Sequence, residues 1–154
     1  VALIALVAAV LAVGIVVFIR YRKIKIALPM VLTGLSEILI ILGVAAAINW
    51  RLDLASIAGI LAAVGTGVDD QIIITDEVLA GEHARSWKER LKRAFFIIFA
   101  AYFTTVVAML PLWWMGAGLV KGFAVTTIIG VTIGVFLTRP AFAKVVEHLL
   151  KRGE

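Results

Sequence analysis

Five long apolar runs, separated by short segments that hold most of the charged residues, constrain this chain more than any other feature. Each run holds about 20 residues, the length that an α-helix needs to cross the roughly 30 Å hydrocarbon core of a bilayer. Because 63% of the 154 residues are hydrophobic, a water-soluble domain of this size would have too little interior to bury them. The sequence therefore predicts an all-α membrane protein, a bundle of five transmembrane helices.

The prolines and polar residues near the ends of the runs set the expected boundaries. Pro29 is tolerated in the first turn of the second span, where its missing N–H has no helical partner. Asp53 or Ser56 is expected to cap the third span. Pro111 is expected to kink the last turns of the fourth span, and Pro140 to start a separate amphipathic tail. We expect spans at about 1–19, 27–48, 54–78, 94–114 and 121–138, a cytoplasmic loop over 79–93 with a short amphipathic helix around Trp87, and a cytoplasmic tail over 139–154.

The distribution of Lys and Arg predicts the orientation of the spans. Of the 15 basic residues, only Arg51 and Lys121 lie between spans two and three or between spans four and five. All the others lie on the opposite side, and cytoplasmic loops carry an excess of Lys and Arg. The chain is therefore expected to start outside and to end inside, in the cytoplasmic membrane. Three indole rings would then anchor the outer interface, namely Trp50, Trp113 and Trp114.

Small residues recur every four positions in two of the spans. In lipid, such stripes let two helix backbones approach closely, and this packing replaces the missing hydrophobic driving force. We expect the stripes to form a helix-packing seam, which is either fixed or one along which helices slide during a transport cycle. The third span carries Gly59, Ala63 and Gly67, and the fifth carries Gly122, Thr126, Gly130, Gly134 and Thr138.

Acidic residues inside the predicted spans are the strongest indication of function. Asp69 lies roughly 22 Å along the third helix, near the midplane, and is followed by Asp70. Glu37 lies about midway through the second span. A charge at this depth costs roughly 2.5–3.5 kcal/mol even on lenient insertion scales, so an intramembrane acid usually serves a function. No Lys or Arg is expected at that depth, so the three acids are expected to be protonated, to bind cations or to pair with another subunit.

Helical geometry separates the two adjacent acids. Neighbouring residues on a helix point about 100° apart, so Asp69 and Asp70 do not form a pair that shares one proton. Asp69 lies on one face with Asp76, which is about 10 Å closer to the cytoplasm. The two residues are therefore candidate stations of a proton path. In the alternative interpretation, Asp76 and Glu77 are ordinary interfacial charges.

Other kinds of chemistry lack a supporting pattern. There is no Cys, and His83 and His148 have no metal-ligand spacing, so we expect two solvated histidines, no metal site and no cofactor. No Ser–His–Asp arrangement or phosphate-binding glycine loop appears, so an enzyme is not expected. The basic residues lie in membrane loops, which argues against nucleic-acid binding. Thr104 and Thr105 are expected to bond back to their own helix.

Two stretches of the sequence resemble a known family. "GTGVDDQIIITDEV", residues 65–78, resembles a membrane span of SecD, a subunit of the SecD–SecF protein-export complex in the resistance–nodulation–division superfamily. "GLVKGFAVTTIIG", residues 118–130, is similar to the V-K-G-F-A-V-T segment of that family, and the "TR" at residues 138–139 also aligns. The resemblance covers essentially the whole chain. It implies half of a superfamily-type transmembrane unit, without the family's first span and large extracellular domain, which agrees with an outside start.

The resemblance implies roles for three acids. Asp69 corresponds to the intramembrane aspartate that the family links to proton coupling, and Asp70 and Glu37 would tune it or relay protons. Glu37 lies where bacterial members often have Asn, Asp70 replaces a usual Ala, and Gln71 replaces a usual Asn. These departures indicate an archaeal-type variant with a more acidic site.

The implied function is to assist polypeptide export with the proton-motive force, or with a sodium gradient. The implied partners are a SecF-like subunit, the Sec translocon, membrane lipid and the exported polypeptide, which would meet the extracellular domain. Two alternatives stay open, a related exporter of lipids or small molecules and a non-transporting scaffold of the translocon. A channel is less favoured, because the small-residue stripes indicate tight packing.

Overall fold

The protein folds into a bundle of long helices. A computed structural model describes residues 2–79 and 87–152, and all the regular elements in these residues are helical. Five helices are long and apolar enough to cross a membrane, so the prediction of an all-α, five-span membrane protein is confirmed. The elements are α1 (Ala2–Tyr21), α2 (Ile24–Ala47), α3 (Leu54–Leu79), α4 (Trp87–Met115), α5 (Leu119–Ile133), the π-helical segment η1 (Gly134–Thr138) and α6 (Arg139–Arg152).

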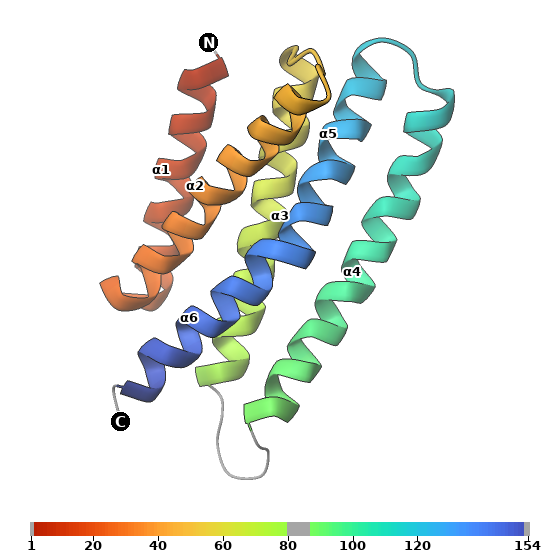
Figure 1. Ribbon diagram of the computed structural model, residues 1–154. Coiled ribbons are helices and arrows are strands. Elements are labelled where there is room, and N and C mark those ends of the chain that lie inside the picture. Colours follow the sequence, from red (N-terminus) through yellow and green to blue (C-terminus); the bar gives the residue numbers. More distant parts are fainter. Residues whose placement is uncertain (1, 80–86, 153–154) are drawn as a thin grey trace.

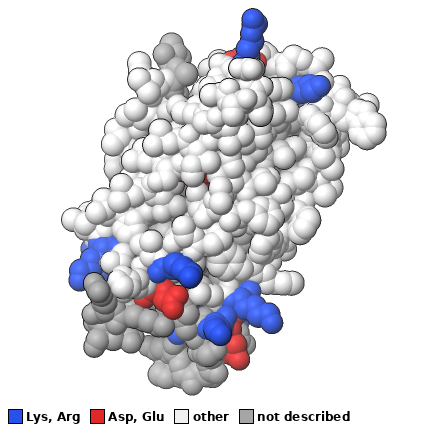
Figure 2. All heavy atoms as spheres, in the orientation of Figure 1, with Lys and Arg blue, Asp and Glu red and all other residues white. Residues whose placement is uncertain are grey.

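Helix α3 forms the centre of the bundle. It packs against α1, α2, α4, α5 and α6, and more than half of its apolar length is buried. Figure 1 shows α1 and α4 at opposite sides of the bundle, with the N-terminus at one end and the C-terminus at the other. On the face shown in Figure 2, most of the charged surface lies at the two ends of the molecule, and a broad band that is nearly free of charge lies between them. This distribution is the one expected of a domain surrounded by lipid.

The end of the fifth span differs from the prediction. Helices α5 and α6 are joined through η1 without a break, and the apolar span runs from Leu119 to Leu149. Proline removes one backbone N–H, and its ring clashes with the carbonyl four residues earlier. The π-helical turn directly before Pro140 moves the hydrogen bonding to five residues back, so the helix continues past the proline. Arg139 therefore lies within the span and not in a solvated tail.

Two other boundaries also differ. Helix α2 begins at Ile24, slightly before the predicted start, and Pro29 lies in its second turn. Helix α4 begins at Trp87 and continues through Pro111 to Met115, so the segment around Trp87 is the first part of α4 and not a separate helix. Residues 80–86 of the predicted loop lie outside the described residues.

A cap fixes the start of α3. Asp53 Oδ1 accepts a hydrogen bond from the backbone N–H of Ser56 at 2.8 Å, which satisfies one of the free amides in the first helical turn. The same bond holds the pKa of the Asp53 carboxyl below its usual value, because it favours the ionised form. Of the two predicted candidates, Asp53 is therefore the cap.

The two stripes of small residues meet between α3 and α5. A Cβ atom added at Gly59 would collide with Thr126 Oγ1, and one added at Gly130 would collide with Ala63 Cβ. The Thr126 hydroxyl also donates a hydrogen bond to the carbonyl of Ser56 at 2.8 Å. The backbones approach this closely because neither helix has a large side chain at the contact.

This contact predicts that Gly130→Ala destabilises the protein. The added methyl group would force α3 and α5 apart, and overpacking of this kind typically costs about 1–3 kcal/mol. Gly34→Ala is the matched control, since Gly34 is also buried in a helix but has no atom within 4 Å of an added Cβ. We expect unfolding in detergent to show lower stability for Gly130→Ala and unchanged or higher stability for Gly34→Ala. Equal stability of the two variants would contradict the tight contact.

Candidate functional site

A fully buried arginine lies at the centre of the site. Arg139 Nη1 donates a hydrogen bond to Glu37 Oε2 at 2.6 Å, and its Nε donates to Asp70 Oδ2 at 3.1 Å. The exposed fractions are 0% for Arg139, 1% for Glu37 and 4% for Asp70. Because the three side chains come from α6, α2 and α3, one guanidinium links three helices. We call this group the charged cluster.

The charged cluster corrects one prediction. No basic residue was expected at the depth of the three predicted acids, yet Arg139 pairs with two of them inside the bundle. Arg139 lies ten residues before Leu149, so about 15 Å of the apolar helix still follows it. The sequence did contain a signal for this pairing, because two buried acids need a cation nearby. Arg139 becomes a candidate for that cation once the helix is allowed to continue past Pro140.

Glycines make the space that the guanidinium fills. A Cβ at Gly67 would lie 2.7 Å from Arg139 Nη2 and 3.0 Å from Glu37 Oε2. A Cβ at Gly134 would collide with Arg139 Nη1, and Gly134 precedes Arg139 by one π-helical turn. Two residues of the predicted packing stripes thus border the charged cluster. The π-turn and these glycines together direct Arg139 inward.

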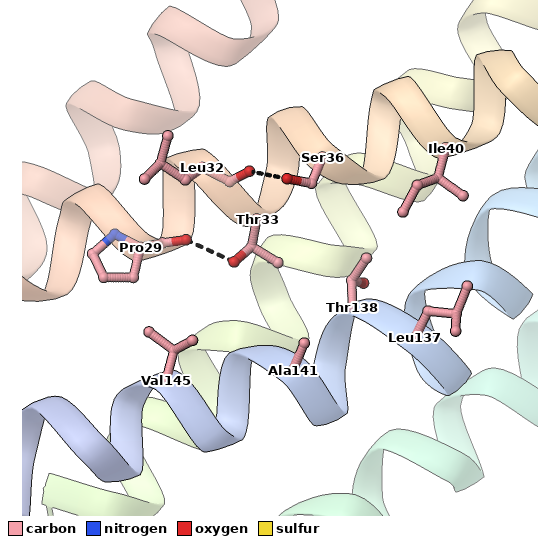
Figure 3. Close-up of a pocket in the computed structure, with 9 residues that line it drawn as sticks. All are labelled: Pro29, Leu32, Thr33, Ser36, Ile40, Leu137, Thr138, Ala141 and Val145. Carbon is pink, nitrogen blue, oxygen red and sulfur yellow. Dashed lines mark hydrogen bonds between the residues drawn. The ribbon is translucent and has the colours of Figure 1, made fainter.

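Thr138 adds a hydroxyl group to the charged cluster. Its Oγ1 accepts from Arg139 Nη1 at 2.8 Å, and its single hydroxyl proton is within hydrogen-bond distance of both Glu37 Oε2 (3.2 Å) and the carbonyl of Gly134 (3.0 Å). Thr138 also lines a groove of about 320 Å³ between α2 and the η1–α6 segment, which Figure 3 shows. The hydroxyls of Thr33 and Ser36 in this groove donate to carbonyls of their own helix. The groove therefore adds no free polar group to the charged cluster.

Several buried polar atoms in the charged cluster and on Gln71 have no hydrogen-bond partner in the described residues. They are Glu37 Oε1, Arg139 Nη2 and both amide atoms of Gln71. Gln71 is 0% exposed and follows Gly67 by one helical turn on α3. Sequence reasoning assigned no role to Gln71, although a glutamine inside a membrane span was itself a signal.

Asp69 takes no part in the hydrogen bonds or ion pairs of the charged cluster. It is exposed on α3, and its carboxylate has no hydrogen bond or ion pair within the described part of the chain. Asp76, nearer the end of α3, accepts from Arg20 Nη2 at 2.6 Å and from the Tyr21 hydroxyl at 2.7 Å. Asp69, Asp70 and Asp76 thus have three different environments.

The remaining candidates have ordinary environments. Thr104 and Thr105 donate to the carbonyls of Ala100 and Ala101, as expected. His148 is exposed, and His83 lies outside the described residues. In residues 2–79 and 87–152, no group of three or more His, Cys, Asp or Glu side chains is placed to hold a metal ion.

The fold and the charged cluster define a class of protein. Ionisable residues that pair with one another inside a helical membrane bundle are typical of pumps and transporters. The sequence comparisons identify the family within this class. The family described as protein export membrane protein SecD/SecF, C-terminal, matches residues 1–149.

Relatives come from archaea and from bacteria. The protein-export membrane protein SecD of Methanocaldococcus jannaschii is 58% identical over 149 residues, which cover 97% of this chain and 37% of that protein. SecD of Thermococcus gammatolerans is 54% identical over 97% of this chain and 29% of its own length. The protein translocase subunit SecD of Endomicrobium trichonymphae is 31% identical over 76% of this chain and 26% of its own length.

The chain belongs to the SecD/SecF protein-export family, and it is similar to the C-terminal transmembrane part of SecD proteins. The comparisons thus confirm the resemblance to SecD that the sequence motifs indicated. The chain spans about a third of the length of the curated relatives that it matches.

The charged cluster predicts a large loss of stability for Arg139→Gln. The change leaves two buried acids without their cation, and breaking a buried ion pair in this way costs about 3–5 kcal/mol. Lys144→Gln is the control, because Lys144 lies on the same helix and is exposed. Unfolding of the full-length protein in detergent checks the prediction. A loss for Arg139→Gln no greater than that for Lys144→Gln would contradict it.

Proposed function

We propose that this chain is the membrane part of a subunit that assists polypeptide export across the cytoplasmic membrane with the energy of the proton gradient. The printed names of its relatives, protein-export membrane protein SecD and protein translocase subunit SecD, support the export role. Each elementary charge that crosses 100 mV supplies about 2.3 kcal/mol. That energy is sufficient to bias an equilibrium between two arrangements of helices.

Asp69 is the proposed proton carrier. The observation that carries this proposal is its position, since Asp69 is an exposed ionisable group near the midplane with no partner in the described residues. Asp70, its neighbour, already has Arg139 as a counter-ion. A carrier must gain and lose its proton during each cycle, and an acid that is not held by a fixed cation meets that requirement. Glu37 and Asp70 would adjust the proton affinity of Asp69 or relay protons to it.

The uncovered face of α3 is the proposed contact for a SecF-like subunit. An acid facing lipid is costly, so a membrane partner or water should cover Asp69. The residues on this face are small, which allows another helix to approach closely. They are Ala58, Ala62 and Gly65, all exposed. The Sec translocon and the exported polypeptide are further proposed partners, the latter through the part of the protein outside the membrane.

The proposed orientation follows the basic residues. The ends of α1, α3 and α6 and the start of α4 would lie on the cytoplasmic side, where Lys and Arg are in excess. Trp113 and Trp114, at the end of α4, would lie at the outer interface, and both are exposed. In this orientation Asp76 lies on the cytoplasmic side of Asp69. It would be the next group on the proton path, held by Arg20 and Tyr21.

This proposal predicts that Asp69→Asn abolishes gradient-dependent export and leaves folding and assembly intact. Asparagine has the size of the acid but cannot carry a proton. Export of a secreted protein into inverted membrane vesicles, with and without a proton gradient, measures the effect. Asp69→Glu is the conservative variant and should retain part of the activity. Thr104→Val serves as the control, because Thr104 is exposed and bonds only its own helix.

The outcomes separate the alternatives. Normal gradient-dependent export by Asp69→Asn would contradict the carrier role and favour a non-transporting scaffold. Export that responds to a sodium gradient but not to a proton gradient would replace the proton by sodium as the coupling ion.

A further inference from the structure

We propose that the charged cluster is a proton-binding site separate from Asp69, and that in the packed bundle it holds one proton on Glu37 Oε1. The part that this proton plays in export rests on the proposed function. The presence of the proton depends only on the geometry of the charged cluster.

The charge of the cluster is unbalanced. Two carboxylates and one guanidinium carry a net charge of −1 when both acids are ionised, and the three side chains are at most 5% exposed. No other charged residue joins the hydrogen bonds or ion pairs of Glu37 and Asp70 in the described part of the chain. A net charge buried at this depth is strongly unfavourable. One further positive charge is therefore required.

A proton meets this requirement better than a metal ion. Hard cations such as Mg²⁺ and Ca²⁺ take about six or more oxygen ligands, whereas the unpartnered buried oxygens here are Glu37 Oε1 and Gln71 Oε1. A metal ion would also lie beside the Arg139 guanidinium and be repelled by it. A proton needs no ligand shell and forms a covalent bond to the acid.

The hydrogen bonds indicate which oxygen binds the proton. Glu37 Oε2 accepts from Arg139 Nη1 and from Thr138, but Glu37 Oε1 is buried and accepts from nothing in the described residues. An ionised carboxylate would leave charge on this unpartnered oxygen, which is costly. When Oε1 carries the proton, the acid is neutral, and Oε2 keeps its donors as a carbonyl oxygen. Asp70 then remains ionised as the sole counter-ion of Arg139.

The surroundings of Glu37 favour this assignment. The polar neighbours of Glu37 are Asp70 on α3 and Arg139 and Thr138 on the η1–α6 segment. In the described residues, no hydrogen bond or ion pair links Glu37 to α1, α4 or α5. Gln71 brings an unpartnered amide to the α3 face that contains Gly67, which lies against Glu37. In this proposal its carbonyl oxygen accepts the acid proton through a water molecule.

Infrared spectroscopy tests the proposal. A protonated carboxyl group has a C=O stretching band that an ionised carboxylate lacks. The sample is the full-length protein with its partner subunit in lipid vesicles at neutral pH, without sodium. We expect Glu37→Gln to lose one such band and to unfold at the same temperature as the wild type, because glutamine resembles the neutral acid.

Asp70→Asn gives the sharper test. With Asp70 neutral, Glu37 becomes the only counter-ion of Arg139, so it should ionise and the same band should vanish although Glu37 is still present. Asp76→Asn is the control and should keep the band, since Asp76 pairs with Arg20 outside the charged cluster. If Glu37→Gln or Asp70→Asn loses no such band relative to the wild type, the proposal is overturned. A band that sodium abolishes overturns it as well, because the cation would then be sodium.

The test is independent of the carrier role of Asp69. Asp69→Asn should keep the Glu37 band whether or not it exports. If Asp69→Asn exports normally and the Glu37 band behaves as expected, the carrier role fails and the proton site stands. If the band is absent and Asp69→Asn loses export, the proton site fails and the carrier role stands.

Discussion

The contact of one arginine with two acids, all withdrawn from water, is the interaction on which the rest of the structure depends. Arg139 links α2, α3 and α6 through Glu37 and Asp70. A buried ion pair is not by itself a strong source of stability, because desolvation offsets the attraction. It does, however, penalise any arrangement that separates the partners. The charged cluster thus favours one packing of three helices over others.

The π-turn and the glycines around Arg139 allow its side chain to be buried inside the bundle. The helix has to pass Pro140 without ending, and the π-turn of η1 permits this. Gly67 and Gly134 leave room for the guanidinium. Gly59 and Gly130 let the backbones of α3 and α5 pack closely against each other. The small residues therefore serve both the packing of the bundle and the charged site.

The sequence predicted what depends on composition and local periodicity. Five spans follow from apolar length, and the divergence of Asp69 from Asp70 follows from helical angles, whereas the choice between Asp53 and Ser56 as the cap of the third span needed the structure. The partner of Asp70 was not predictable in this way, because Arg139 is distant in sequence and the proline next to it normally ends a helix. Periodicity separated the two aspartates but did not tell which one faces the protein interior, since that depends on the contacts of α3 with its neighbours.

In the proposed mechanism the two adjacent aspartates have different tasks: Asp70 holds the bundle together, and Asp69 exchanges protons with its surroundings. The central claim is that Arg139 and Asp70 interact directly inside the membrane. A double-mutant cycle in the free energy of unfolding, with Arg139→Gln, Asp70→Asn and the double variant, measures this interaction. The account predicts that the double variant is more stable than Arg139→Gln alone, because it no longer buries an unpaired Asp70. Additive losses of stability would contradict it.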